Sequence, residues 1–390
     1  MILQGIRLAD GEQNVNVRIN NGKIDALTSV PIAGNTADLQ LGFDDALIFP
    51  GLINSHDHLD FNLFPQLGNR TYKNYTEWGA YIHQQYKPEI ERVLQVPLPL
   101  RIRWGMYKNL LCGVTTVVNH GEQLIIDDAL ITVYEETHDL HSVGFEKLWK
   151  LKLNNPLKKH LPVAIHIGEG TDEAASIEID SLIRWNKWRR VLIGIHAVAM
   201  TGKQASSFKG IVWCPESNYY LLNKTAPVHQ LKQHTTILFG TDSTLTGNWN
   251  IWDHIGMARK TGLLTDDELF HSLNSNAAKV WKMNTGAINK GKDADLVIAR
   301  RKDHAAGFDS FYDLSPADLL LVIHQGNTRL FDQELLSQLA SGLKGRGFSL
   351  IRINKVHKYV EGNLGELMEQ IHTYLPEFSF PIEFIDHQIL

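Results

Sequence analysis

The chain is poor in cysteine and has no long apolar segment. Its 390 residues include only two cysteines, Cys112 and Cys214. They do not form a CxxC pair, so neither a disulfide framework nor a thiolate zinc site is expected. No apolar run reaches the roughly 20 residues that a membrane-spanning helix needs. The N-terminus has no basic segment followed by an apolar stretch, as a signal peptide would. We therefore expect a soluble, cytoplasmic protein.

An excess of positive charge and several enzyme motifs are also missing. The net charge is −5 and the sequence pI is about 6.4, so no nucleic acid or membrane partner is expected. The chain has no HExxH, GxSxG, GxxxxGK[ST] or strand-borne GxGxxG, and WCPES lacks the second cysteine of a PCxxC pair. These absences exclude five protein classes: zincins, serine hydrolases, P-loop proteins, dinucleotide-binding proteins and cytidine-type deaminases. A small-molecule substrate is the expected partner, and a homodimer remains an open option.

Strand-like and helix-like stretches alternate through the middle of the chain. Apolar stretches such as PVAIHIGE and LIGIHAVA are separated by amphipathic stretches such as DEAASIEIDSLIRWN and TDDELFHSLNSNAAKVW. This alternation predicts a parallel sheet with crossover helices, so the fold class is α/β. Both ends of the chain are instead β-rich, and Asn20, Asn21 and Gly22 predict a tight turn between two strands.

Three parts are expected from this pattern. Residues 51–284 should form a metal-binding, distorted (β/α)8 barrel of the TIM type. Residues 1–50 and 285–332 should meet as one small composite β domain, a β-sandwich. Residues 333–390 should form a C-terminal α/β extension without a chemical motif.

Histidines and an aspartate stand at the ends of several predicted strands. His56 and His58 follow an apolar run and are two residues apart, so their side chains should point to the same side. His166, His196 and Asp242 stand near the ends of later predicted strands. Because strand ends meet at one mouth in a parallel barrel, these five side chains should converge. Alone, each is more often a satisfied polar residue, but the series favours one Zn²⁺ or Fe²⁺ ion.

A carboxylate accompanies the third histidine. Glu169 stands three residues after His166 in HIGEGTDE, and a turn there would let it face the same mouth. In that position it could carry protons. The alternative is a solvated loop glutamate.

Four further residues are candidates for lining a substrate pocket. His120 and Glu122, in VVNHGE, end another predicted strand, although a structural role is equally open. Trp78 and Trp104 could form an aromatic wall for a flat ring. Aromatic residues in such helices more often belong to the core.

The chain resembles the amidohydrolase superfamily. The stretches that carry the resemblance occur in the family's order from residue 49 to about 300, and they are PGLINSHDH, GVTTVVNHG, HIGEGTDE, LIGIHA, WCPESNYYLL, GTDS and NTGAINKGKDADLVI. They are similar to the branch of cytosine, guanine and S-adenosylhomocysteine deaminases and triazine chlorohydrolases. The resemblance implies one divalent transition metal ion with four ligands, His56, His58, His166 and Asp242. It leaves His196 as a contact to the metal-bound water or the substrate, or as a further ligand.

The resemblance also implies a reaction. The expected activity is hydrolysis of a non-peptide C–N bond in a small cyclic amidine or amide, by deamination of a heterocycle. The metal would activate a water to hydroxide near neutral pH. Asp242 would accept its proton, Glu169 would protonate the substrate ring, and His196 would stabilise the oxyanion. Ring opening of a cyclic amide or imidazolone stays as an alternative, as does a non-enzymatic scaffold on the same barrel.

Some features depart from the family pattern. Asp57 stands between the paired histidines, where the family more often has a small polar residue. We expect it to hydrogen-bond a ligand imidazole from outside the metal shell, or to face outward. Only about fifty residues separate VTTVVNH from PVAIHIGE, which predicts an abbreviated barrel there. Lys150 and Lys152 are the nearest candidates for the bridging lysine of two-metal relatives, but the HxxE pattern favours one metal.

Overall fold

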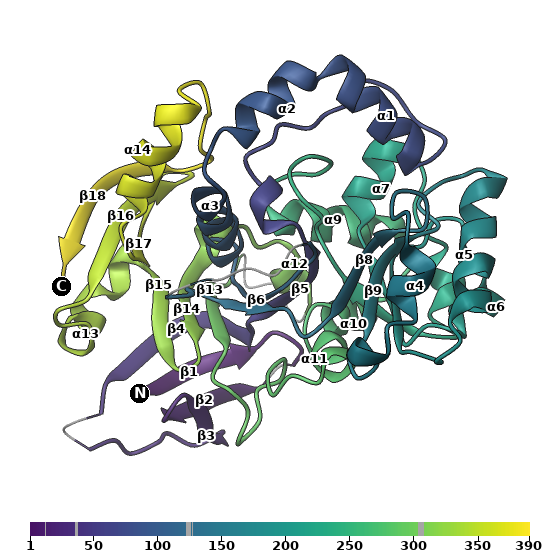
Figure 1. Ribbon diagram of the computed structural model, residues 1–390. Helices are drawn as coiled ribbons and strands as arrows, with labels where there is room; N and C mark the ends of the chain where they lie inside the picture. Colours follow the sequence, from purple (N-terminus) through teal and green to yellow (C-terminus); the bar gives the residue numbers. More distant parts are fainter. Residues whose placement is uncertain (12, 36–37, 122–125, 127, 303–307) are drawn as a thin grey trace.

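Three sheets organise the chain in the computed structural model (Figure 1). The structure describes residues 1–390 except 12, 36–37, 122–125, 127 and 303–307. Among the described residues, no helix is both long and apolar enough to cross a membrane. The sheets have ten, five and three strands, and the two smaller ones carry the candidate site.

Eight parallel strands in chain order form the two smaller sheets. The three-stranded sheet holds β5 (Leu52–Asp57), β6 (Val114–Asn119) and β7 (Thr132–Tyr134). The five-stranded sheet holds β8 (His138–Ser142), β9 (Val163–Ile167), β10 (Leu192–His196), β11 (Gly210–Trp213) and β12 (Thr236–Phe239). The last strand returns to the first, since the Asp242 amide donates to the His56 carbonyl at 3.0 Å. The predicted α/β fold with a parallel sheet is confirmed.

These strands are buried on both faces. Every residue of β5, β6, β9 and β10 is buried, which explains why their sequences are continuous apolar runs rather than alternating ones. The seam between β7 and β8 has no ladder among the described residues, and β7 has only three residues. This is the stretch in which the short spacing predicted an abbreviated barrel.

Helices cover the outside of these strands and the edges of the large sheet. They are α1 (Tyr75–Gln85), α2 (Lys87–Leu94), α3 (Leu98–Leu110), α4 (Trp149–Leu153), α5 (Glu173–Trp185), α6 (Gly202–Ala205), α7 (Pro215–Leu222), α8 (Val228–Leu231), α9 (Ile251–Thr261), α10 (Asp266–Ser272), α11 (Ser275–Trp281), α12 (Phe308–Tyr312), α13 (Leu336–Leu339) and α14 (Leu364–Tyr374). A capping box of Thr265 and Glu268 starts α10. The expected single helix is divided, because the Asn274 side chain caps the Ser275 amide and starts α11.

The ten-stranded sheet contains both ends of the chain. Its strands are β1 (Ile2–Leu8), β2 (Asn14–Asn20), β3 (Lys23–Thr28), β4 (Gln40–Pro50), β13 (Leu296–Arg300), β14 (Leu319–His324), β15 (Asn327–Asp332), β16 (Gly347–Ile353), β17 (Val356–Glu361) and β18 (Glu383–Ile389). The predicted turn between β2 and β3 is present, with positive φ angles of 48° at Asn21 and 74° at Gly22. Because β4 pairs with β1 on one side and β13 on the other, it joins the two ends.

Both ends of the chain thus lie in one mixed sheet, and its form as a β-sandwich remains a prediction. Strand β17 pairs with β15, and β16 pairs with β17 and β18, so residues after 333 extend that sheet. The stretch DQELLSQLASGL forms the single turn of α13 between two 3₁₀ turns. The division into domains remains a prediction.

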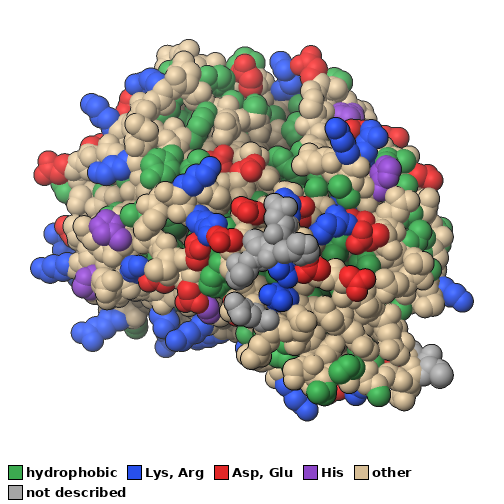
Figure 2. All heavy atoms as spheres, turned by 180° about the vertical axis from the view of Figure 1, so that it is seen from behind, with side chains coloured by type: hydrophobic (Ala, Val, Ile, Leu, Met, Phe, Trp, Pro, Cys, Tyr) green, Lys and Arg blue, Asp and Glu red, His purple; other side chains and the backbone are tan. Residues whose placement is uncertain are grey.

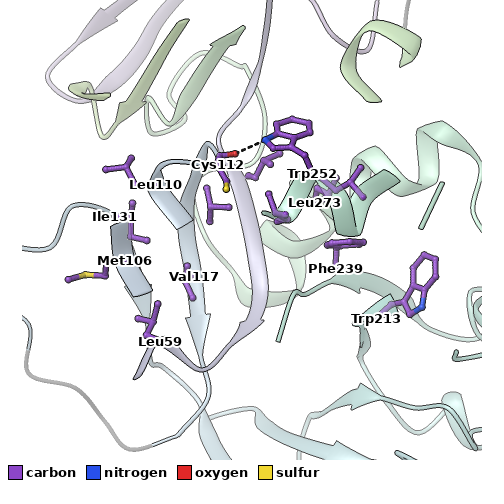
Figure 3. Close-up of a cluster of buried hydrophobic side chains, with 14 of the residues drawn as sticks. Leu59, Met106, Leu110, Cys112, Val117, Ile131, Trp213, Phe239, Trp252 and Leu273 are labelled. Atoms are coloured by element: carbon purple, nitrogen blue, oxygen red, sulfur yellow. Dashed lines mark hydrogen bonds between the residues drawn. The ribbon is translucent and has the colours of Figure 1, made fainter. Parts of the chain in front are cut away.

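Large apolar side chains fill the space between the strands and their helices (Figure 3). Figure 3 shows Leu110 near Cys112, and Trp213 near Phe239. The indole N–H of Trp252 donates to the Cys112 carbonyl at 3.1 Å, so α9 is tied to the loop before β6. Close packing of this kind keeps the strand ends at fixed positions. On the back of the molecule, acidic and basic side chains lie next to one another (Figure 2).

Candidate metal centre and substrate cavity

Four imidazoles and one carboxylate from different strand ends meet at one point. His166 Nε2 lies 3.2 Å from His56 Nε2 and 3.3 Å from His58 Nε2. Asp242 Oδ1 lies 3.6 Å from His56 Nε2 and 3.7 Å from His58 Nε2. His196 Nε2 lies 3.9 Å from Asp242 Oδ2. The structure thus brings together the five residues that the sequence singled out.

This spacing fits one transition metal ion. A tetrahedral ion with ligand distances of about 2.05 Å holds its ligand atoms about 3.3 Å apart. The ligand atoms of His56, His58 and His166 all lie within 4.8 Å of one another, as do those of His56, His196 and Asp242. Nitrogen and carboxylate donors suit Zn²⁺ or Fe²⁺ better than Mg²⁺ or Ca²⁺.

The charge states also suit a metal. Burial lowers the pKa of His56, and burial together with neighbouring imidazoles lowers the pKa of His166 well below its usual value. Neutral imidazoles have the free lone pair that coordination requires. Burial alone would raise the pKa of Asp242, but the adjacent His56, His58 and His196 bring it well below its usual value. Asp242 is therefore an anion.

Neighbouring groups hold the ligands in orientation. His166 Nδ1 donates to the His141 carbonyl at 2.7 Å, so its Nε2 is left to face the centre. The hydroxyls of Ser217 and Thr246 each donate to Asp242 Oδ2 at 2.9 Å. Asp242 has a positive φ of 59°. Unfavourable backbone of this kind is retained where the surroundings over-determine it, often at functional sites.

His196 is held in one tautomer. Its Nδ1 lies 2.9 Å from Asn218 Oδ1, and the Asn218 Nδ2 donates to the Thr225 hydroxyl at 3.2 Å. That second contact orients the amide, so His196 Nδ1 carries the hydrogen. Burial lowers the pKa of His196 to about 4. A neutral ring in this tautomer offers Nε2 as an acceptor or a ligand, and it could donate to an oxyanion only when protonated.

Glu169 lies beside the same centre. It is 5% exposed, and its Oε1 is 3.6 Å from His196 Nε2. Burial and the negative charges of Asp242 and Glu178 raise its pKa well above the usual value. Glu169 is therefore a buried carboxyl group whose surroundings favour the protonated form, rather than a solvated loop glutamate.

A cavity of about 530 Å³ opens over the centre. Its polar lining includes His58, His166, Glu169, His196 and Asp242. Its apolar lining includes Phe61, Tyr75, Trp78, Phe145, Leu221 and Leu245. The volume suits a single heterocyclic ligand.

The four pocket candidates have different positions. Trp78 lines the cavity and is fixed by donation from its indole to the Leu67 carbonyl at 2.7 Å. Trp104 is 1% exposed, is not among the residues that line this cavity, and packs against Phe380, so it belongs to the core. His120 lines a neighbouring cavity with His58, and its Nδ1 lies 3.8 Å from Asp139 Oδ1. Glu122 lies outside the described residues.

Asp57 faces away from the metal ligands. It accepts hydrogen bonds from Lys108 Nζ at 3.0 Å, Asn109 Nδ2 at 2.8 Å and Asn62 Nδ2 at 2.9 Å. Asn54 Nδ2 lies 3.3 Å from the same carboxylate. No described bond joins Asp57 to a ligand imidazole, so of the two expectations the outward-facing one is found. Its charge is balanced by the buried ammonium of Lys108.

Several site residues were not foreseen. Tyr75 donates to Glu178 at 3.0 Å, and Glu178 accepts from the Gly168 amide at 2.7 Å, which braces the turn before Glu169. His141 lines the cavity at the end of β8. The strand-end position of His141 could have identified it, because it follows the rule that found the other histidines. Lys150 and Lys152 lie on α4 and do not line the cavity.

An α/β fold with histidine and aspartate side chains gathered at strand ends is an arrangement typical of metal-dependent hydrolases. Residues 157–328 match the amidohydrolase family. The matched segment contains His166, Glu169, His196 and Asp242.

Known proteins similar to the chain are deaminases and a chlorohydrolase. A 5'-deoxyadenosine deaminase of Methanothrix thermoacetophila is 22% identical over 310 residues, which are 65% of this chain and 73% of that protein. An adenosine deaminase from Xanthomonas campestris with bound zinc superposes with a TM-score of 0.72 at 16% identity, covering 97% of this chain and 98% of that one. Atrazine chlorohydrolase from Arthrobacter aurescens, complexed with zinc, gives a TM-score of 0.72 at 15% identity, covering 96% and 100%.

Proposed function

We propose that the protein is a metal-dependent deaminase of a purine-like heterocycle. The observation that carries this proposal is Glu169, a buried carboxyl group with a raised pKa that shares a cavity with the candidate metal ligands. Hydrolysis of an exocyclic amine needs a proton for the ring and a second proton for the leaving group. The similar deaminases support the same reaction class.

His56, His58, His166 and Asp242 would hold one divalent transition metal ion, Zn²⁺ or Fe²⁺. When bound, such an ion lowers the pKa of water in the site towards 7. We read β5–β12 as one distorted (β/α)8 barrel, whose strand ends aim these side chains into the cavity. His196 Nε2 lies close enough to Asp242 to be a fifth contact of the ion.

The protein's own groups would move the protons. Asp242 is an anion with one oxygen turned to the histidines, so it can accept a proton from the attacking water. Glu169 would donate its proton to a ring nitrogen, take up the proton of the hydroxyl group formed on the attacked carbon, and pass it to the departing amino group, which leaves as ammonia. The proton accepted by Asp242 would then return to Glu169. His196, with Nε2 as an acceptor, would orient the water rather than stabilise an oxyanion by donation.

The cavity walls favour a flat and largely apolar ligand. Phe61, Trp78 and Phe145 provide aromatic surface, which binds planar rings well. Glu169 and Asp242 are the acidic residues among the lining residues that the structure describes, and no lysine or arginine is found among them. A neutral base or nucleoside thus fits better than a phosphorylated one.

The test is ammonia release by the metal-loaded protein from a panel of purines, purine nucleosides, pterins, pyrimidines and imidazolones. Release of ammonia from a purine or its nucleoside, with preference over the phosphorylated forms, is the expected result. Turnover without ammonia would replace deamination by ring opening. Stoichiometric metal without turnover on any ring would contradict the proposal.

A further inference from the structure

Two segments outside the candidate metal centre form one continuous surface patch. They are residues 147–160, which contain α4, and residues 184–191, which include the last two residues of α5. Asn154 Nδ2 donates to the Trp185 carbonyl at 2.9 Å, and Arg190 donates to the Lys158 carbonyl at 2.7 Å. Figure 1 shows α4 and α5 on the same side of the molecule. We call these two segments together the basic apolar patch.

The patch has no acidic residue. Neither segment contains Asp or Glu, although the whole chain has a net charge of −5. Eight of its cationic side chains are exposed, and they are Lys147, Lys150, Lys152, Lys158, Lys159, Arg184, Lys187 and Arg189. Of these, Lys152 pairs with Glu146 at the edge of the patch, at 2.9 Å. No ion pair with an acid is found for the other seven within the described part of the chain.

Elsewhere on the molecule, basic side chains are paired with acidic ones, unlike most of those in the patch. Arg259 lies 2.8 Å from Asp266, and Lys302 lies 2.7 Å from Asp318. On the face drawn in Figure 2, the two signs also alternate in the centre of the view. The positive charge of the basic apolar patch is thus a local feature, which a sum over the whole chain conceals.

Large apolar side chains are exposed among these cations. Leu157 is 83% exposed, Leu151 is 70% exposed and Trp188 is 56% exposed. Leu148, Trp185 and Val191 are also exposed. Apolar surface of this extent is costly in water unless a partner covers it. Leucine and tryptophan interleaved with lysine and arginine are typical of proteins that lie on a membrane surface.

We propose that the basic apolar patch binds the surface of a bilayer that contains anionic phospholipid. The cations would lie at the headgroups, where each contributes through attraction to negative lipid. The exposed leucines and Trp188 would enter the boundary between headgroups and acyl chains.

Two other partners fit the patch less well. An RNA strand would use aromatic faces for stacking. However, Lys150 lies 4.5 Å and Lys187 5.7 Å from the centroid of the Trp185 ring, and they occupy its faces. The exposed leucines would gain nothing from a nucleic acid. A symmetric contact with a second copy would place the same cations opposite one another, which is repulsive.

The position of the patch leaves the cavity accessible. Residues 154–161 lead into β9, and residues 186–191 lead into β10, so they lie at the strands' amino ends. The candidate metal ligands lie at the opposite, carboxyl ends. Docking through residues 154–160 and 186–191 would therefore turn the substrate cavity away from the lipid, and Lys152 would lie at the edge of the patch nearest the neighbouring cavity. The proposal does not depend on the proposed deaminase activity.

The test is co-sedimentation of the purified, full-length protein with phosphatidylcholine vesicles, with and without about 30% phosphatidylserine. Binding to the anionic vesicles alone, and its loss as salt rises from about 0.05 to 0.5 M, is the expected result. Replacing Lys158→Glu and Lys159→Glu together should weaken binding at least about tenfold. Replacing Leu151→Ser and Trp188→Ser together should weaken it to a similar degree.

The matched control carries the same change of charge elsewhere. Lys290→Glu with Lys344→Glu alters two exposed lysines outside the patch, and its vesicle binding should change less than about twofold. All variants should keep the unfolding temperature of the unaltered protein. No binding to anionic vesicles, equal loss in the control, binding to a single-stranded RNA oligonucleotide alone, or self-association alone would each overturn the proposal.

Discussion

Strand β5 contributes to two buried polar clusters that are built in opposite ways. On one side, the Nε2 atoms of His56 and His58 lie 3.2 and 3.3 Å from His166 Nε2. The same two atoms lie 3.6 and 3.7 Å from Asp242 Oδ1. On the other side, Asp57 receives nitrogen donors from Lys108, Asn109, Asn62 and Asn54.

The difference separates a ligand site from a structural one. Buried polar groups in proteins are normally hydrogen-bonded, and a satisfied network rigidifies the fold. The Asp57 network meets that condition with its own side chains. The histidine cluster instead brings ring nitrogens and a carboxylate oxygen to one point, where a bound cation would satisfy all of them together. The two clusters should therefore respond differently to substitution.

Removing a metal ligand should have the largest effect on activity. Asp242→Ala takes away the only carboxylate of the ligand set and the proposed proton acceptor. We expect turnover to fall by roughly 10³-fold or more, with loss of metal. His58→Ala should do the same. The measurements are kcat and metal content by atomic absorption, before and after dialysis against a chelator.

The control for these variants is His229→Ala, which removes an exposed histidine on α8. It should retain full metal content and turnover. Full activity in Asp242→Ala would remove the aspartate from the proposed ligand set.

Changing Glu169 should separate proton transfer from metal binding. Glu169→Gln keeps the size of the side chain but removes its exchangeable acid proton. Turnover should fall by about 10²- to 10⁴-fold, the range for loss of a general acid or base. Metal content should be unchanged, because Glu169 is not one of the proposed ligands. Steady-state kinetics and metal analysis of the same preparation test this, and normal turnover would contradict the proton-transfer role.

Breaking the Asp57 network should affect stability more than chemistry. Lys108→Met leaves the buried Asp57 carboxylate without its cation, and the expected loss is about 3 to 5 kcal/mol of unfolding free energy. Adding Asp57→Asn should restore part of this stability, since no charge then remains buried. Urea unfolding of both variants measures the difference.

Metal content distinguishes a substitution in the Asp57 network from one in the metal centre. The metal-loaded Lys108→Met protein should keep its ion below the unfolding transition, unlike Asp242→Ala. Equal stability of Lys108→Met and the unaltered protein would mean that water replaces the ammonium.

The two clusters also show what the sequence could predict. The period of two placed His56 and His58 on one side of a strand and Asp57 on the other, and the strand-end rule found His166, His196 and Asp242. These are local patterns. The partner of Asp57 is Lys108, which lies 51 residues later on α3. No local pattern indicates that contact, since it depends on how a helix packs over a strand.

The same limit explains the other differences. Trp78 and Trp104 stand in similar amphipathic segments, yet one lines the cavity and the other lies in the core. The turn at Asn21 and Gly22 was predicted because its residues specify its geometry. The addition of β16–β18 to the large sheet was not, because long-range strand pairing has no local signature.

A brace behind Glu169 gives the smallest expected effect, and it depends on pH. Burial raises the pKa of Glu178 to about 7 from a usual value of 4.5. Between pH 4.5 and about 7, Glu178 is protonated more often in the folded protein than in the unfolded chain. The free energy of unfolding therefore falls as the pH rises through this range. The full loss is up to about 3 kcal/mol. Glu178→Gln, which stays neutral, should match the unaltered protein near pH 4.5 and be more stable above pH 7. Urea unfolding across this pH range measures the difference in unfolding free energy between Glu178→Gln and the unaltered protein. The control is Glu173→Gln, which changes an exposed glutamate. A difference that is constant with pH would show that Glu178 does not titrate in this window.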